Sequence, residues 1–140
     1  MDLSKISSKL TNKDLDILSV LWNSKKPMTA LEITEADPSL MKNTVQPALR
    51  KLLKNEVIKV ADIVYSGTVL CRSYEPTISK EEVFLHRLSS EYTQLEKDIS
   101  KASFVSFLLK NEKDKKQFKQ DLKELQELLD SYTSIDTTDN

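Results

Sequence analysis

The sequence predicts a mainly α-helical protein that includes one small β-hairpin. The 140 residues include one glycine and four prolines, the residues that usually interrupt helices, and 31% of the residues are charged. Apolar residues recur at helical spacing over most of the chain. Two runs with strand-like composition, residues 57–64 and 68–74, flank the single glycine, Gly67. These observations indicate a helical protein that carries one hairpin.

Two short helices are expected near the N-terminus. Thr11 suits the N-cap of the first helix, because its hydroxyl can accept a hydrogen bond from a free backbone N–H. We expect this helix to end near Trp22, whose spacing from the apolar stripe predicts a structural role as a core or interdomain anchor. A short extended segment then leads to Thr29, the expected N-cap of a helix over residues 30–36. Asp37 precedes a proline and is expected to end that helix.

A third helix with two chemically different faces is expected to begin at Asn43. Asn43 and Gln46 have the spacing of a capping box, and Pro47 is expected to lie in the first turn, where it removes little hydrogen bonding. Between positions 41 and 60, five basic residues stand against one acidic residue, in a chain of net charge -1. The expected core face comprises Val45, Ala48, Leu49, Leu52 and Leu53. The expected outward face comprises Asn43, Gln46, Pro47, Arg50, Lys51 and Lys54.

The C-terminal part of the chain is expected to pair two subunits. A long helix opens at Ser79, which with Glu82 has capping-box spacing, and its apolar residues recur at the 3-and-4 spacing of a heptad as far as Ala102. A short apolar helix and a last helix after Asp114 follow, and the tail from residue 134 is expected to be frayed. The expected dimer interface comprises Leu85, Leu88, Tyr92, Leu95, Ile99, Phe104, Phe107, Leu108, Phe118, Leu122, Leu125 and Leu129, with Tyr132 ending the last seam. A helical hairpin within one chain is the alternative.

Composition excludes several classes of function. Cys71 is the single cysteine and His86 the single histidine, so no disulfide, cysteine–histidine metal site or histidine-based catalytic pair is expected. The sequence has no glycine-rich phosphate loop. We therefore expect no catalytic residue, no cofactor and no bound metal. The chain lacks an apolar run long enough to span a membrane and a secretion signal, so we expect a cytoplasmic protein.

Three helices followed by a hairpin predict a winged helix-turn-helix domain, here residues 1–77, followed by a helical dimerisation region, residues 78–140. In such a domain the third helix enters the major groove of double-stranded DNA and the hairpin lies beside it. Polar and basic side chains on that helix suit base edges and phosphates. The predicted DNA-binding residues are Lys42, Asn43, Thr44, Gln46, Pro47, Arg50, Lys51, Lys54, Tyr65, Ser66 and Arg72. A homodimer would bind an inverted repeat.

The order and spacing of several short motifs resemble a known family. The residues that carry the resemblance are Leu10, Thr11, Asp14, Ile17, Leu18, Leu21 and Trp22, then Met28, Thr29, Glu32 and Ile33, then Asn43, Thr44 and Val45, and finally Arg72, Tyr74 and Pro76. Together they resemble the penicillinase repressor family, the BlaI and MecI group with its copper-responsive relatives. The resemblance covers residues 10 to about 130.

The resemblance implies a homodimeric transcriptional repressor on a palindromic operator, with a three-helix C-terminal dimerisation region. In β-lactam-responsive members a membrane sensor protease triggers cleavage near an Asn-Phe bond. This chain has Phe107-Leu108 at that place, and its tail lacks the cysteines of the copper-responsive members. Family members commonly carry a basic residue or threonine where this chain has Gln46 and Pro47, so a different operator sequence is expected. The inducing signal, a protease or a small ligand, stays open.

Two alternatives accompany the repressor hypothesis. One is a small-molecule-responsive winged-helix regulator in the MarR or PadR style, with a ligand pocket between the domains. The other treats the winged domain as a protein-interaction module that does not bind DNA. A ligand-dependent shift in thermal stability would favour the first, and the absence of duplex affinity at low salt would favour the second.

Overall fold

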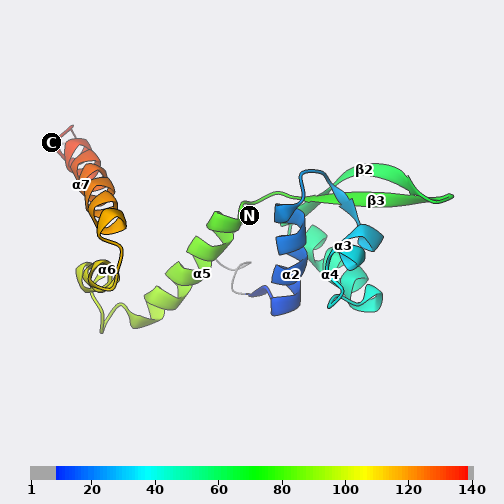
Figure 1. Ribbon diagram of the computed structural model, residues 1–140, viewed down its shortest axis with the longest axis horizontal. Helices are drawn as coiled ribbons and strands as arrows, with labels where there is room; N and C mark the ends of the chain where they lie inside the picture. The colour runs from blue at the N-terminus through cyan, green and yellow to red at the C-terminus, as the bar shows by residue number, and fades with distance from the viewer. Residues whose placement is uncertain (1–8, 139–140) are drawn as a thin grey trace. The chain divides into compact units, whose positions relative to one another are not determined.

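The computed structural model describes residues 9–138 and divides the chain into two compact units, Met1–Thr93 and Gln94–Asn140 (Figure 1). In chain order the elements are α2 (Asn12–Asn23), β1 (Met28–Thr29), α3 (Ala30–Ala36), α4 (Lys42–Lys54), β2 (Ile58–Ser66), β3 (Val69–Pro76), α5 (Lys80–Leu95), α6 (Lys101–Lys110) and α7 (Lys115–Thr138). The division into units falls inside α5. The functional boundary expected between residues 77 and 78 stays a prediction.

Capping boxes begin α2 and α3, and both expected N-caps are confirmed. The Thr11 hydroxyl accepts a hydrogen bond from the Asp14 backbone N–H at 3.1 Å, and the Thr11 N–H donates to the Asp14 carboxylate at 2.9 Å. At α3 the Thr29 hydroxyl accepts from the Glu32 N–H at 3.2 Å, and the Thr29 N–H donates to Glu32 at 3.1 Å. Each box satisfies two N–H groups that a helix start otherwise leaves free.

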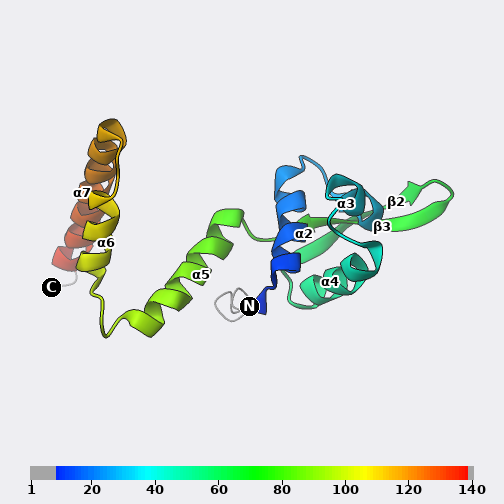
Figure 2. The ribbon, with the colours of Figure 1, turned by 60° about the horizontal axis from the view of Figure 1, so that its bottom comes forward.

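The predicted hairpin is present, and it belongs to an antiparallel three-stranded sheet with the order β1-β3-β2. β2 and β3 form the hairpin, whose turn places Gly67 at a φ of 67°, a left-handed conformation that glycine adopts without strain. The short extended segment before α3 is a strand, because Met28 pairs with Tyr74 and Thr29 with Ser73. This pairing was not predicted. The hairpin extends beyond the helices as a wing (Figure 2).

The core of the first unit lies where α2, α3 and α4 pack against the sheet. The expected stripe of α4 is confirmed, since Val45, Leu49 and Leu52 are buried while Ala48 and Leu53 pack partly buried against them. The buried apolar residues are Leu10, Ile17, Leu18, Leu21, Ile33, Leu40, Val45, Leu49, Leu52, Val57, Ile58, Tyr74, Ile78 and Val83. Residues from every helix of the unit contribute, so burial of this cluster holds α4 in place.

The start of α4 differs from the prediction. The helix begins at Lys42 with Met41 as its N-cap, and no side chain caps it, so the capping box expected between Asn43 and Gln46 is wrong. The Thr44 hydroxyl instead donates to the Met41 carbonyl at 2.7 Å. Pro47 therefore lies beyond the first turn, where its missing N–H removes one helical hydrogen bond. The earlier start leaves the Asn43 and Gln46 side chains free for other partners.

The C-terminal end of α4 is closed by a Schellman motif. The Val57 N–H donates to the Leu52 carbonyl and the Glu56 N–H to the Leu53 carbonyl, both at 3.0 Å. Glu56 occupies the left-handed position, with a φ of 61°, where glycine is the usual residue. Thr77 fixes this turn from the other side, because its hydroxyl donates to the Glu56 carbonyl at 2.6 Å. The turn directs the chain from α4 into β2.

Trp22 joins α2 to the segment that begins α5, which confirms its predicted structural role. Its indole N–H donates to the Ile78 carbonyl at 2.9 Å, and its ring centroid lies 6.2 Å from that of Phe84. The Ser79 hydroxyl accepts from the Glu82 N–H at 3.1 Å, as the capping spacing predicts, and Val83 is buried. The first turn of α5 is therefore held against the winged domain.

The predicted continuous heptad seam is wrong beyond Leu95. At that residue α5 ends, because the Asp98 and Ile99 N–H groups both donate to the Leu95 carbonyl and the Ser100 hydroxyl starts α6 by accepting from the Ser103 N–H. Ile99 consequently lies in the turn between two helices. A serine at an N-cap position competes with continued helix, and the apolar spacing did not reveal this.

The second unit contains α6 and α7, two helices whose side chains line common grooves. α7 begins after Asp114, as predicted, but the tail expected to be frayed is helical through Thr138, and residues 139 and 140 lie outside the described residues. Repeated hydrogen bonds one turn apart support this helix, for example the 3.0 Å bond from Gln126 to Asp130. Of the helices between residues 9 and 138, none has both the length and the apolar character needed to cross a bilayer.

Candidate nucleic-acid interface

The outward face of α4 is a surface of polar and basic side chains. The exposed residues are Lys42, Asn43, Thr44, Gln46, Pro47, Arg50 and Lys54. Asn43, Gln46 and Arg50 follow one another at intervals of three and four residues and therefore share one face of the helix. Within residues 9–138 their side chains make no hydrogen bond or ion pair, so their donors and acceptors are available to a ligand.

Lys51 has a partner that sequence reasoning missed. Its ammonium lies 2.5 Å from the Asp14 carboxylate of α2, and the Asp14 side chain is 4% exposed whereas that of Lys51 is 39% exposed. The same carboxylate oxygen accepts the Thr11 N–H. Lys51 therefore compensates a buried charge and fixes α4 against α2, which differs from the phosphate contact expected of it. The sequence places Asp14 at the third residue of a predicted helix. That Asp14 pairs with Lys51 follows only from the folded structure.

The turn between α3 and α4 is held by Asp37. Its carboxylate accepts from the Ser39 hydroxyl at 2.6 Å and from the Ser39 N–H at 3.0 Å. These hydrogen bonds hold the pKa of Asp37 below its ordinary value of 3.8. Leu40 follows and is buried, which anchors the turn to the core. The arrangement of α3, turn and α4 is that of a helix-turn-helix.

The wing carries Tyr65 and Ser66 at the end of β2 and Arg72 on β3, but its tip carries no cation. Tyr65 is 73% exposed and pairs with Leu70, while Arg72 pairs with Ile63. The segment from residue 60 to residue 71 contains one acidic and no basic residue. Of the three predicted wing residues, Arg72 alone can therefore neutralise a phosphate.

Exposed apolar side chains of the wing were not predicted as part of the interface. Ile63, Val69 and Leu70 are 60%, 62% and 57% exposed, although apolar groups of this size are usually buried. Their strands carry apolar residues at successive positions rather than alternating ones, so the sequence did not show which face was unburied. Apolar side chains of this kind cannot form hydrogen bonds or ion pairs with phosphates.

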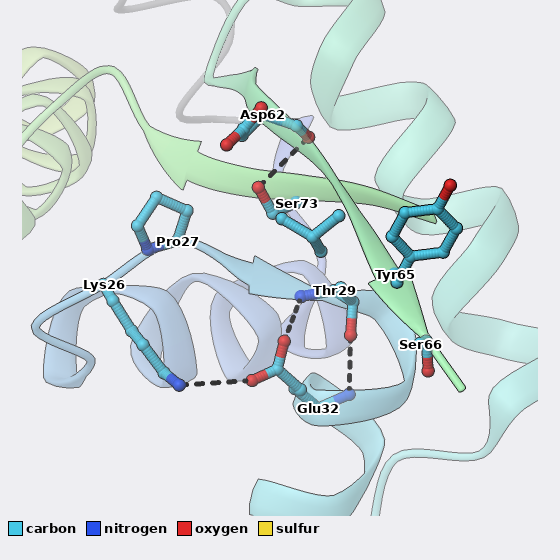
Figure 3. Close-up of a pocket in the computed structure, with 9 residues that line it drawn as sticks. Lys26, Pro27, Thr29, Glu32, Asp62, Tyr65, Ser66 and Ser73 are labelled. Atoms are coloured by element: carbon cyan, nitrogen blue, oxygen red, sulfur yellow. Dashed lines mark hydrogen bonds and ion pairs between the residues drawn. The ribbon is translucent and has the colours of Figure 1, made fainter. Parts of the chain in front are cut away.

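A hollow of about 440 Å³ lies between the wing and the start of α3 (Figure 3). Glu32 lines it and is satisfied by its own helix cap and by Lys26, whose ammonium lies 3.7 Å away. The Thr29 N–H, followed by the Thr29 hydroxyl and Lys26, lowers the pKa of Glu32 from its ordinary 4.5 against an opposing effect of burial. The Ser73 hydroxyl donates to the Asp62 carbonyl at 3.1 Å across the hairpin. Side chains of the wing and of α3 line this hollow together.

The predicted dimer residues form exposed apolar surface on α5, α6 and α7. Phe118 and Leu125 of α7 are half-buried, Leu125 lines the groove between α6 and α7, and Ile99 lies in the turn before α6. Phe107 and Leu108, at the place of the family's cleavage bond, lie inside α6. The predicted interface residues that are at least 38% exposed are Leu85, Leu88, Leu95, Ile99, Phe104, Phe107, Leu108, Leu122 and Leu129. Large apolar side chains exposed in such number are typical of a protein interface.

Between residues 9 and 138 the structure contains no group of three or more His, Cys, Asp or Glu side chains able to hold a metal ion. A helix-turn-helix with a β wing and an unpaired polar recognition helix defines a winged-helix DNA-binding regulator of transcription. Residues 10–131 match the family model described as penicillinase repressor, so the chain belongs to the penicillinase repressor family. Proteins of this family regulate transcription and are not enzymes, and this chain is a winged-helix transcriptional repressor that binds DNA.

Solved structures of winged-helix regulators resemble the chain at low sequence identity. They include Staphylococcus aureus MarR in complex with salicylate and kanamycin (14% identity, 94% of this chain and 79% of that chain, TM-score 0.45). MepR, a transcription regulator of the Staphylococcus aureus multidrug efflux pump MepA, is 18% identical, with 93% of this chain and 90% of that chain covered and a TM-score of 0.42. Streptococcus pneumoniae FabT in complex with DNA is 15% identical, with 91% of this chain and 78% of that chain covered and a TM-score of 0.40. With TM-scores below 0.5 these likenesses carry no functional argument. No curated protein sequence matches the chain.

Proposed function

We propose that the protein represses transcription as a homodimer that binds an inverted-repeat operator through α4 and the wing. The observation that carries this proposal is the unpaired polar face of α4, presented by a helix whose opposite face packs into the core. Arg50 suits bidentate recognition of guanine, and Asn43 or Gln46 suits adenine. Lys42 and Lys54 lie at the two ends of the helix, where they suit phosphates.

Dimer formation accounts for the apolar surface of the C-terminal helices. One winged domain covers a short stretch of DNA, and two domains related by a two-fold axis require two half-sites related by the same symmetry. Bound over a promoter, such a dimer excludes the transcription machinery. The C-terminal region therefore serves to join two DNA-binding domains.

The proposal is tested with duplexes selected by the purified protein from a random pool. We expect the selected sequences to contain an inverted repeat and the protein to bind it as a dimer. Removing one half-site should reduce affinity strongly, whereas a scrambled duplex should bind weakly and with a steep dependence on salt. Absence of any duplex affinity at low salt would contradict DNA binding and favour the protein-interaction role.

A further inference from the structure

We propose that the two subunits of the dimer meet through α7 in antiparallel orientation, with Leu125 close to the two-fold axis. This inference rests on the proposed dimer and specifies its geometry. The contacting surface is the seam of Phe118, Leu122, Leu125, Leu129 and Tyr132, which follows one face of α7.

The apolar residues of the seam have nearly the same spacing in both directions along α7. Its spacings are 4, 3, 4 and 3, so reversal about Leu125 brings Phe118 opposite Tyr132 and Leu122 within one residue of Leu129. An antiparallel pair therefore matches leucine with leucine and one aromatic ring with another. Heptad spacing is also compatible with a parallel pair, and the choice between the two orientations depends on charge.

Charge is distributed unequally along α7. Residues 115–123 contain four lysines and one aspartate, whereas residues 124–138 contain four acidic residues and no basic residue. A parallel pair of α7 helices would place basic ends together and acidic ends together, which is repulsive. An antiparallel pair places the basic end of each helix beside the acidic end of the other. Charge complementarity therefore favours the antiparallel orientation.

Lys119 and Asp130 are the charged residues best placed to make this contact. Eleven residues, three helical turns, separate them, so they lie on the same flank of the seam but about 16 Å apart along the axis. They cannot pair within one helix. Both are exposed, and Asp130 uses Oδ1 to accept from Gln126 at 3.0 Å. Reversal about Leu125 brings Lys119 next to Asp130 of the partner subunit, and symmetry repeats the pair.

The residues that line the groove between α6 and α7 show which side of the seam is exposed to solvent. A hollow of about 550 Å³ is lined by Val105 and Leu109 of α6 and by Leu122, Leu125 and Leu129 of α7, among other residues. Leu122 and Leu129 are 42% and 60% exposed, and Leu125 is half-buried. A second α7 laid over this hollow would bury both leucines, and its polar flank would bring Lys119 and Asp130 together.

Disulfide trapping in the full chain distinguishes the orientations. In a Cys71→Ser background, chains carrying Lys119→Cys and chains carrying Asp130→Cys are mixed and oxidised. The antiparallel dimer predicts a disulfide between the two different chains and little between identical chains. Absence of the disulfide between the two different chains, in a protein that still sediments as a dimer, would overturn the inference while leaving the dimer intact. A protein that sediments as a monomer would overturn the dimer itself.

Charge reversal provides an independent test by sedimentation equilibrium at low salt. Lys119→Glu should weaken dimerisation about threefold to tenfold, because each dimer loses two exposed ion pairs. Lys116→Glu is the matched control: it changes net charge equally, but Lys116 lies on the face of α7 turned away from the seam, so the substitution should have little effect. Combining Lys119→Glu with Asp130→Lys in one chain should restore the wild-type dimer. Equal weakening by both single variants, or no restoration, would contradict the proposed contact.

Discussion

Lys51 of the recognition helix and Asp14 of α2 form a 2.5 Å ion pair whose carboxylate is 4% exposed. Asp14 at the same time accepts the Thr11 N–H at 2.9 Å, so one carboxylate completes a helix cap and holds a second helix. The position of α4 relative to α2 is therefore fixed by charge as well as by apolar packing. Lys51 therefore supports, from its edge, the polar face of α4 that we propose binds DNA.

Replacing Lys51 with methionine should lower the free energy of unfolding by about 2 kcal/mol, because Asp14 is then buried without its cation. Asp14→Asn should also destabilise the protein. Combining the two substitutions should cost less than the sum of the single effects, since neither residue then leaves an unpaired charge. Urea denaturation of the four proteins measures this coupling. Strictly additive effects would show that the pair contributes nothing specific.

Arg50 and Lys54 should differ in the kind of DNA contact that they make. We expect Arg50→Ala to lose about 1 to 3 kcal/mol on the selected operator and much less on random duplex, because Arg50 is placed to read a base. Lys54→Ala should weaken both duplexes alike and reduce the salt slope by about one. Fluorescence anisotropy over a salt series measures both quantities. Equal losses on both duplexes for Arg50→Ala would remove its assignment as a base-reading residue.

Glu56→Gly should stabilise the protein by about 0.5 to 1 kcal/mol. Glu56 is a non-glycine residue at a φ of 61°, and glycine adopts this conformation without the contact between Cβ and the carbonyl oxygen. The hydrogen bonds of this turn come from backbone groups and stay intact. Thermal unfolding followed by circular dichroism provides the measurement, with Glu56→Ala as the control that keeps Cβ. A similar gain for both substitutions would attribute the effect to charge instead of conformation.

Glu32 should make stability depend on pH in the acidic range. Because the Thr29 N–H lowers the pKa of Glu32 below 4.5 in the folded protein, the folded state favours the charged form. This stabilisation is fully present above the pKa of the unfolded chain and is lost as pH falls through the lower, folded value. The advantage of wild type over Glu32→Gln should therefore be constant near neutral pH and shrink below about pH 4.5. An advantage that does not change with pH would exclude this linkage.

Local chemistry made much of the winged domain predictable. Thr11, Thr29 and the Gly67 turn were identified because each satisfies or permits a specific backbone conformation, and the α4 stripe because its spacing matches one helix face. Met28 pairs with Tyr74, and Lys51 pairs with Asp14. Both pairs join residues far apart in sequence, so no local pattern predicts them. The break after Leu95 was missed because heptad spacing continues through it.

The central claim is that two copies of α4 enter successive major grooves on one face of a duplex, and a footprint of the purified protein on the DNA upstream of its own coding sequence tests it most directly. We predict two protected tracts related by an inverted repeat, with centres one helical turn or a multiple of it apart. Arg50→Ala should lose both tracts together. A single tract bound by one protomer, or no protection at low salt, would contradict the account.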